Sequence, residues 1–132
     1  MSFAVVGIDH VEVYVRNLEA AAKWYREVLG LAEIHRWQPE PIMIGAGETK
    51  LALFQARGDV PKTPGVRQVP AALRWHRVAW RTDNEGFDRA QQHLQDRAVK
   101  FRGPVDHEVA ESIYFEDPDG NPLEITYYRE KT

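Results

Sequence analysis

The fold of this chain is decided by the stretch Val105-Asp-His-Glu-Val-Ala-Glu-Ser-Ile-Tyr-Phe-Glu-Asp-Pro-Asp-Gly-Asn-Pro-Leu-Glu124. It predicts two short strands joined by a turn, because the Pro and Gly within residues 117–121 can reverse the chain. Alternation along the strands places Tyr114 and Glu124 on one face and the apolar residues on the other. We therefore expect Tyr114 and Glu124 to lie close together. A carboxylate on such a strand needs a partner, which can be a metal ion, an arginine or water.

The rest of the chain predicts the same order of elements twice, namely a strand, a helix and three strands. In the first half these are strand 5–15, helix 18–29 and strands 32–37, 42–44 and 51–55. In the second half they are strand 75–82, a helix capped by Asn84, and strands 99–101, 112–115 and 123–127. We predict a single α+β domain, residues 1–132, made of two βαβββ modules at about 1–57 and 73–132. A connector rich in Pro and Gly, residues 58–72, joins them.

Composition excludes several classes of function. Lys and Arg number 17 against 20 Asp and Glu, and the sequence pI is about 5.9, so no basic surface predicts binding to nucleic acid or to an acidic membrane. The chain has no cysteine, which excludes disulfides, zinc–thiolate sites and a thiol nucleophile. No signal peptide or membrane span is predicted, and we expect a cytoplasmic protein.

The element order and two motifs resemble the vicinal oxygen chelate superfamily, which includes glyoxalase I, bleomycin- and fosfomycin-resistance proteins and extradiol dioxygenases. The motifs are His10-Val-Glu-Val-Tyr-Val with Trp24-Tyr-Arg-Glu-Val-Leu-Gly-Leu31, and Ser112-Ile-Tyr-Phe-Glu-Asp-Pro-Asp-Gly-Asn-Pro-Leu-Glu124. The resemblance implies that the paired modules curve into a cup with the helices on its outer face. It also implies that the cup binds a divalent metal and a small molecule with adjacent oxygen atoms.

By this resemblance the metal ligands are His10, His76 and Glu124, and Fe(II) is favoured over Mn, Ni and Zn. Two imidazoles and a carboxylate leave open positions for a chelating substrate. The choice of His76 has a rival in Arg77. Strict alternation with Val78 puts Arg77 at the position that matches His10, and only a β-bulge would turn His76 toward the site. An arginine there would pair with the carboxylate and oppose a cation.

His107 and Tyr114 resemble the histidine and tyrosine that lie beside the metal ligands in extradiol dioxygenases, where they would bind substrate and move protons. Both residues are therefore candidate catalytic groups. The strand at residues 51–55 has Ala52 where glyoxalase I places a second metal-binding carboxylate. We therefore predict that glyoxalase I activity is absent.

Three functions remain open at this point. The first is a metal-dependent oxidoreductase closest to extradiol dioxygenases. The second is a binding protein of the bleomycin-resistance type that performs no chemistry, and the third is a fosfomycin-type thiol transferase, a lyase or an isomerase. A homodimer is expected, because two such modules leave apolar strand surface for a symmetric partner to cover. The sequence leaves open whether the cup forms within one chain or across a dimer.

Overall fold

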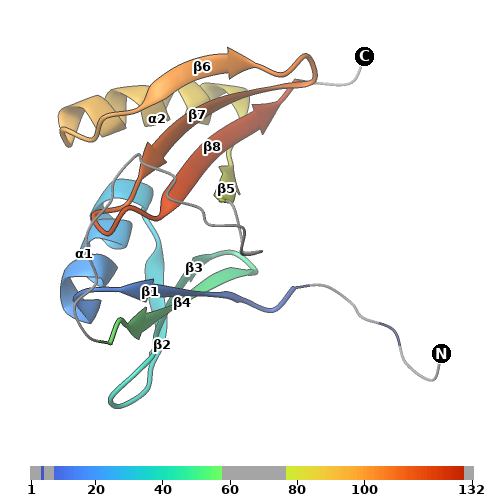
Figure 1. Cartoon of the computed structure of the whole chain (residues 1–132). Helices are drawn as coiled ribbons and strands as arrows, with labels where there is room; N and C mark the ends of the chain where they lie inside the picture. The colour runs from blue at the N-terminus through green and yellow to red at the C-terminus, as the bar shows by residue number, and fades with distance from the viewer. Residues whose placement is uncertain (1–3, 5–7, 58–76, 130–132) are drawn as a thin grey trace, which may run out of the picture. The chain divides into compact units, whose positions relative to one another are not determined.

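The computed structural model describes residues 4, 8–57 and 77–129. The chain forms two compact units, Met1–Val60 and Pro61–Thr132 (Figure 1). The predicted connector at residues 58–72 lies outside the described residues, as do the predicted strand residues 5–7, 75 and 76. In the part of the chain that is described, no helix is long and apolar enough to span a membrane.

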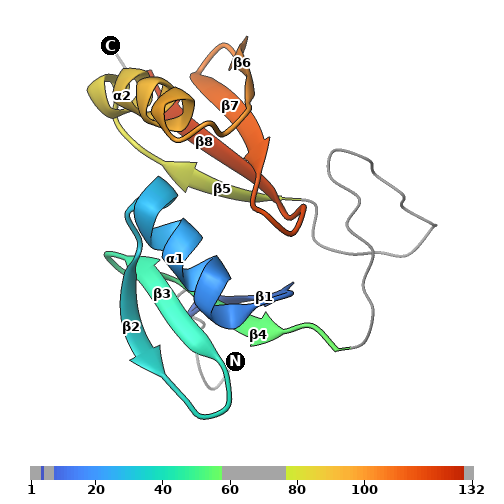
Figure 2. The ribbon, with the colours of Figure 1, turned by 90° about the vertical axis from the view of Figure 1, so that its left-hand side faces the viewer.

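The first unit contains one helix and one four-stranded sheet. Its elements are β1 (Val11–Val15), α1 (Leu18–Leu29), β2 (Ala32–Arg36), β3 (Ile42–Ala46) and β4 (Thr49–Gln55). The strand order is β1-β4-β3-β2, with β1 parallel to β4 and the other neighbours antiparallel. Figure 2 shows that α1 lies across one face of this sheet. The other face is therefore free for a site.

Helix α1 begins and ends where the sequence predicts. The side chain of Asn17 accepts a hydrogen bond from the backbone N–H of Ala20 at 2.9 Å, which satisfies one free donor of the first turn. Gly30 ends the helix with φ of 70°, a conformation that glycine adopts without strain. Tyr25 and Val28 of this helix are buried, as expected for the apolar side of a helix that packs on a sheet. Their burial fixes which face of the sheet belongs to the core.

The second unit repeats the first. Its elements are β5 (Val78–Arg81), α2 (Asn84–Asp96), β6 (Arg102–Asp106), β7 (Ala110–Glu116) and β8 (Pro122–Tyr128). The strand order is β5-β8-β7-β6, with β5 parallel to β8 and the other pairs antiparallel. The predicted α+β fold of two βαβββ modules is confirmed.

Two predicted boundaries in the second unit are wrong. The helix cap is Asp83, whose side chain accepts the backbone N–H of Gly86 at 2.7 Å, whereas Asn84 is already the first helical residue. The strand predicted at residues 99–101 begins instead at Arg102. Val99 follows the turn that ends α2, and its N–H donates to the carbonyl of Leu94 at 2.8 Å. A β-branched residue in a helix-ending turn was mistaken for a strand residue.

Candidate functional site

The β7–β8 hairpin brings Tyr114 and Glu124 together as predicted, since they are direct partners in its register. The turn is held by Asp117, which is 4% exposed and accepts the backbone N–H groups of Asp119 and Asn121 at 2.8 Å each. The apolar neighbours Ile113 and Leu123 are almost fully buried on the other face. Tyr114 and Glu124 therefore share the face that is not used for the core of this unit.

Glu124 has a fixed orientation. The hydroxyl of Ser112, a residue only 1% exposed, donates to Glu124 Oε2 at 2.6 Å. Ser112 Oγ also lies 2.9 Å from Thr126 Oγ1, which donates to the carbonyl oxygen of Glu111 at 3.1 Å. This buried chain of hydroxyl groups holds one carboxylate oxygen and leaves Oε1 for a ligand. Sequence reasoning missed Ser112, although its spacing from Glu124 already placed it on the same face.

His107 and Tyr114 form a hydrogen-bonded pair, with 2.6 Å between His107 Nε2 and the tyrosine oxygen. His107 follows β6, and its backbone N–H donates to the carbonyl of Ala110 at 2.8 Å, which fixes the loop beside β7. A hydroxyl and an imidazole at this distance can pass a proton in either direction, depending on the ring tautomer. The structure thus brings together three of the predicted site residues, His107, Tyr114 and Glu124.

Arg77 lies on the same face as these residues. Its guanidinium carbon is 4.6 Å from the centroid of the Tyr114 ring, and the guanidinium of Arg102 on β6 is 4.3 Å from the same centroid. The β5–β8 register pairs Ala79 with Glu124, so the residue two positions before Ala79 shares the face of Glu124. This is the placement that strict alternation predicts for Arg77. His76, the predicted ligand, lies outside the described residues.

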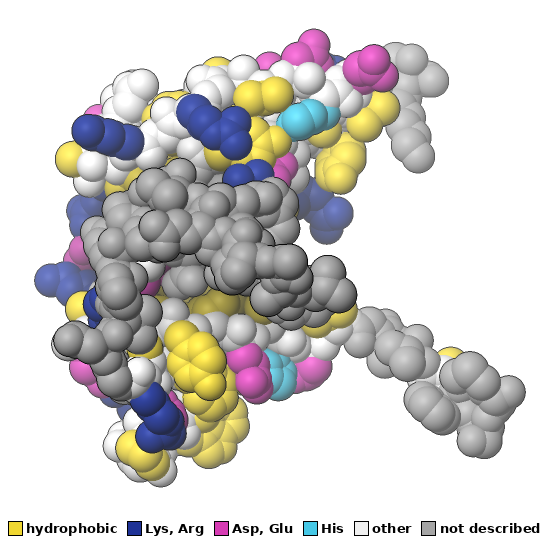
Figure 3. Space-filling model, in the orientation of Figure 1, with side chains coloured by type: hydrophobic (Ala, Val, Ile, Leu, Met, Phe, Trp, Pro, Cys, Tyr) yellow, Lys and Arg dark blue, Asp and Glu magenta, His cyan; other side chains and the backbone are white. Residues whose placement is uncertain are grey.

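In the first unit His10 sits between two carboxylates. Its Nδ1 lies 2.9 Å from Asp9 Oδ2, and its Nε2 lies 2.9 Å from Glu12 Oε2. The Asp9 hydrogen bond and then the Glu12 hydrogen bond raise the pKa of His10 above its ordinary value, because both stabilise the imidazolium form. Figure 3 shows acidic side chains gathered around a histidine, beside an apolar patch on this unit.

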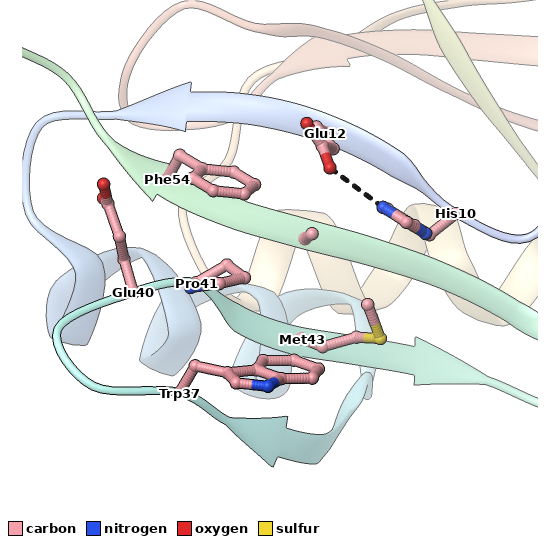
Figure 4. Close-up of a pocket in the computed structure, with 8 residues that line it drawn as sticks. His10, Glu12, Trp37, Glu40, Pro41, Met43 and Phe54 are labelled. Carbon is pink, nitrogen blue, oxygen red and sulfur yellow. Dashed lines mark hydrogen bonds and ion pairs between the residues drawn. The ribbon is translucent and has the colours of Figure 1, made fainter.

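A pocket opens beside His10 on the sheet face that α1 leaves free. Figure 4 shows aromatic and apolar side chains along this face, with Glu12 and His10 joined at one end. The lining residues are His10, Glu12, Trp37, Glu40, Pro41, Met43, Ala52 and Phe54. A pocket with mostly apolar walls and a few polar groups is typical of small-molecule sites. Sequence reasoning missed Glu40, Met43 and Phe54, although Ala52 and Phe54 alternate with the core residues Leu51 and Leu53 of β4.

Two of the predicted metal ligands, His10 and Glu124, are among the described residues. His10 provides an imidazole in the first unit and Glu124 a carboxylate in the second, and both are donor types that Fe(II) accepts. Within the described residues, no group of three or more His, Cys, Asp or Glu side chains is arranged so that it could hold a metal ion. Arg77 does not fit the metal, because a fixed positive charge on the face of Glu124 opposes a cation. The complete ligand set is thus a proposal that depends on His76.

The comparison with protein families agrees with this fold. The model of the glyoxalase/bleomycin resistance protein/dioxygenase superfamily matches residues 7–125. The chain belongs to this superfamily. Superfamily members of several activities have the same module, so membership establishes the architecture and leaves the reaction to be argued from the site.

The individual relatives within the superfamily do not share one named activity. Biphenyl-2,3-diol 1,2-dioxygenase 3 of Rhodococcus globerulus is 30% identical over 123 residues, which are 89% of this chain and 61% of that enzyme. The chain therefore spans about three fifths of the length of this curated relative. A virulence protein of Salmonella typhimurium is 30% identical over 126 residues, with 92% of this chain and 83% of that protein covered. The crystal structure of a glyoxalase/dioxygenase from Nostoc punctiforme shares the fold with a TM-score of 0.80 at 24% identity, covering 95% of this chain and 92% of that chain.

Proposed function

We propose that this chain is a divalent-metal-dependent oxidoreductase that acts on a small molecule with adjacent oxygen atoms, closest to extradiol dioxygenases. In this proposal His10, His76 and Glu124 hold the metal, and Fe(II) is the favoured ion. The observation that carries the proposal is the hydrogen bond between His107 and Tyr114. Tyr114 lies on β7, directly opposite Glu124 on β8. A proton-transfer pair next to a ligand carboxylate is what ring-opening chemistry on a catechol requires.

Each described residue has a role in this proposal. The metal, when bound, would act as a Lewis acid on the two neighbouring oxygens of the substrate. Tyr114 would donate a hydrogen bond to the substrate. It would also exchange its proton with Nε2 of His107, in either direction. Ser112 would keep Glu124 Oε2 occupied, so that Oε1 is the ligating atom. Ala52 lines the first pocket where a carboxylate base would be required, which supports the prediction that glyoxalase I activity is absent.

The second candidate is a binding protein that holds a small molecule without a metal, and the specific observation in its favour is Arg77. The guanidinium packs on Tyr114 and lies on the face of Glu124, at the register position that corresponds to His10. A permanent cation at that position weakens divalent-metal binding and favours an anionic ligand. The apolar pocket of the first unit suits either candidate, since both bind an aromatic molecule.

Metal content separates the two candidates. Protein purified without chelator and dialysed against Fe(II) under nitrogen is analysed for metal, together with His10→Ala, His76→Ala, Glu124→Gln and the matched control His93→Ala on α2. The enzyme proposal expects close to one ion per site in the wild type and the control, and loss of the metal in the three ligand variants. Wild-type protein that is folded but retains no metal would contradict it and leave the binding function.

Oxygen uptake with a panel of catechols tests the reaction itself. Fe(II)-loaded wild type should consume oxygen with at least one catechol, and Tyr114→Phe should lower kcat by about 10²-fold, the usual contribution of a positioned proton donor. The same substitution should leave the metal content unchanged, because the phenol hydroxyl is not a ligand. Metal-loaded protein that is inactive on the whole panel would shift the proposal to lyase, isomerase or thiol-transferase chemistry.

We also propose that the protein is a homodimer. Tyr14 is 67% exposed and Trp37 is 45% exposed on the site face of the first unit, which leaves apolar surface for another module to cover. Light scattering coupled to size-exclusion chromatography tests the proposal, with a mass of twice 15.2 kDa expected and a mass of one chain contradicting it. The cytoplasmic location stays a prediction.

A further inference from the structure

Two arginines pack against one tyrosine ring in the second unit. Arg102 is the direct partner of Tyr114 in the β6–β7 register, and Arg77 lies just before β5. Their guanidinium carbons lie 4.3 Å and 4.6 Å from the ring centroid, respectively. Contact with an aromatic face restricts the rotamers of a long side chain, so that less entropy is lost when the guanidinium binds a ligand. The two cations are therefore held in place before any ligand arrives.

These two charges are not neutralised by the residues that the structure describes. No salt bridge there joins either arginine to a carboxylate, whereas the guanidinium groups of Arg36 and Arg129 each pair with acidic side chains. The Nε atom of Arg77 is buried and has no hydrogen-bond partner among the described residues. Two guanidinium groups that contact one ring repel each other, and a bound anion weakens that repulsion.

Of the neighbouring groups, the Tyr114 hydroxyl favours an anion, whereas the Glu124 carboxylate on the same face repels one. Glu124 is the carboxylate opposite Tyr114, and its Oε2 is already occupied by the hydroxyl of Ser112. The Tyr114 oxygen and His107 Nε2 share one hydrogen bond, and in the tautomer in which Nε2–H donates, the tyrosine hydroxyl can donate to a second oxygen atom. Two guanidinium forks next to a phenol hydroxyl form a donor-rich surface that suits an oxyanion, since a fork can give two parallel hydrogen bonds.

From these contacts we propose that Arg77, Arg102 and Tyr114 form an oxyanion-binding site, and that the small molecule bound by this protein carries a carboxylate or a phosphoryl group. The inference deepens the proposed function, because it names a substituent of the proposed substrate beyond its two adjacent oxygens. It needs no metal, however, and it applies equally to the binding-protein candidate. Its test is therefore run on metal-free protein, where failure of metal binding does not affect the result.

Isothermal titration calorimetry with EDTA-treated full-length protein gives the first test. Benzoate and inorganic phosphate are the two anionic probes, and benzamide is the neutral ligand of nearly the same shape as benzoate. The proposal expects saturable binding of benzoate or phosphate and none of benzamide. A carboxylate-bearing substrate is indicated if benzoate binds, and a phosphoryl-bearing one if phosphate binds. Equal binding of benzoate and benzamide, or no saturation by either anion at about 10 mM, well above a Kd of ~1 mM, would overturn the proposal.

Three variants assign the binding to these residues. Arg77→Gln and Arg102→Gln should each weaken the affinity for the anion about tenfold or more, because each removes one charged donor. The matched control Arg89→Gln, in the exposed pair of Arg89 with Glu85 on α2, should leave the affinity unchanged. Arg102 is exposed, so Arg102→Gln keeps the test valid even if Arg77→Gln lowers the stability of the fold. Anion affinity that both substitutions leave unchanged would contradict the site.

Discussion

The two units have the same strand order but opposite chemistry on their site faces. In the first unit the parallel pair places Glu12 next to Ala52, so the carboxylate is on the first strand. In the second unit the equivalent pair places Ala79 next to Glu124, so the carboxylate is on the last strand. His10 lies two residues before Glu12, and Arg77 lies two residues before Ala79. A duplicated fold thus presents an acidic and aromatic surface in one copy and a basic and hydroxyl-rich surface in the other.

This difference shows which face of each sheet the fold constrains. The faces that pack on α1 and α2 hold the same kinds of residue in both units, for example Leu51 and Leu123, which are both 1% exposed. The opposite faces do not contribute to these cores, so their side chains can differ without loss of the fold. The function of the chain is therefore found in the faces on which the two units differ.

The largest predicted effect compares the core face with the site face. Leu51→Ala and Leu123→Ala should each lower the free energy of unfolding by about 3 kcal/mol, because each leaves a cavity in a packed core. The matched site-face variant Tyr14→Ala should cost much less, since Tyr14 is 67% exposed. Urea unfolding followed by circular dichroism measures all three. Similar losses at Tyr14 and Leu51 would contradict the division into two faces.

A smaller effect is expected for the buried hydroxyl that the second unit uses to hold its carboxylate. Ser112→Ala removes the donor to Glu124 Oε2 and one neighbour of Thr126 Oγ1. The free energy of unfolding should fall by about 1–2 kcal/mol, because buried polar atoms lose a partner. The exposed Thr49→Ala, at the start of β4, is the control and should change stability by less than about 0.5 kcal/mol. No loss in Ser112→Ala would show that Glu124 is not held by this residue.

Making the second unit resemble the first gives a third test. Arg77→His replaces the guanidinium with the residue type found at the corresponding position, His10. Divalent-metal affinity should rise about tenfold, equivalent to ~1.4 kcal/mol, since a fixed cation is replaced by a group that can be neutral. Competition with a chelating dye measures the affinity, and Arg81→His on β5 is the matched control. Unchanged affinity in Arg77→His would mean that Arg77 does not influence the metal.

The smallest effect concerns the ion-pair cluster around Arg36 in the first unit. Arg36 hydrogen-bonds to Glu19 and Glu33, and these contacts lower the pKa of both carboxyls below 4.5. A carboxyl whose pKa is lower in the folded than in the unfolded state stabilises the fold at pH values above its unfolded-state pKa. This stabilisation is lost as the pH falls through the folded-state pKa. In Arg36→Gln both pKa values should rise toward 4.5. A carbon-13 NMR titration measures both pKa values in the wild type and in Arg36→Gln. Values that are the same in the two proteins would exclude the pairing in solution.

Much of the fold follows from local sequence signals. Asn17 and Gly30 fix the ends of α1 because capping requires only neighbouring backbone groups. The proline- and glycine-containing turn at residues 117–121 fixes the register that pairs Tyr114 with Glu124. The start of β6 was mispredicted because it depends on how α2 ends. Val99 has strand propensity, but a hydrogen bond to Leu94 overrides it.

The candidate site is less accessible to sequence reasoning. Alternation correctly indicated that Arg77 shares the face of Glu124, but not that its guanidinium would pack on Tyr114. The role of Arg102 depends on a cross-strand contact with β7, which no spacing along the chain reveals. The two carboxylates around His10 were also missed as a pair, because Asp9 lies outside β1 and its side-chain direction is not set by strand alternation.

Anomalous diffraction at the iron edge tests the central claim most directly, on crystals grown with Fe(II) under nitrogen. We predict one strong peak within about 2.0–2.2 Å of Glu124 Oε1 and of ring nitrogens of His10 and His76. The peak should disappear in crystals of Glu124→Gln. A guanidinium of Arg77 in that position, with no iron peak at Glu124, would contradict the metal-dependent enzyme and leave the oxyanion-binding protein.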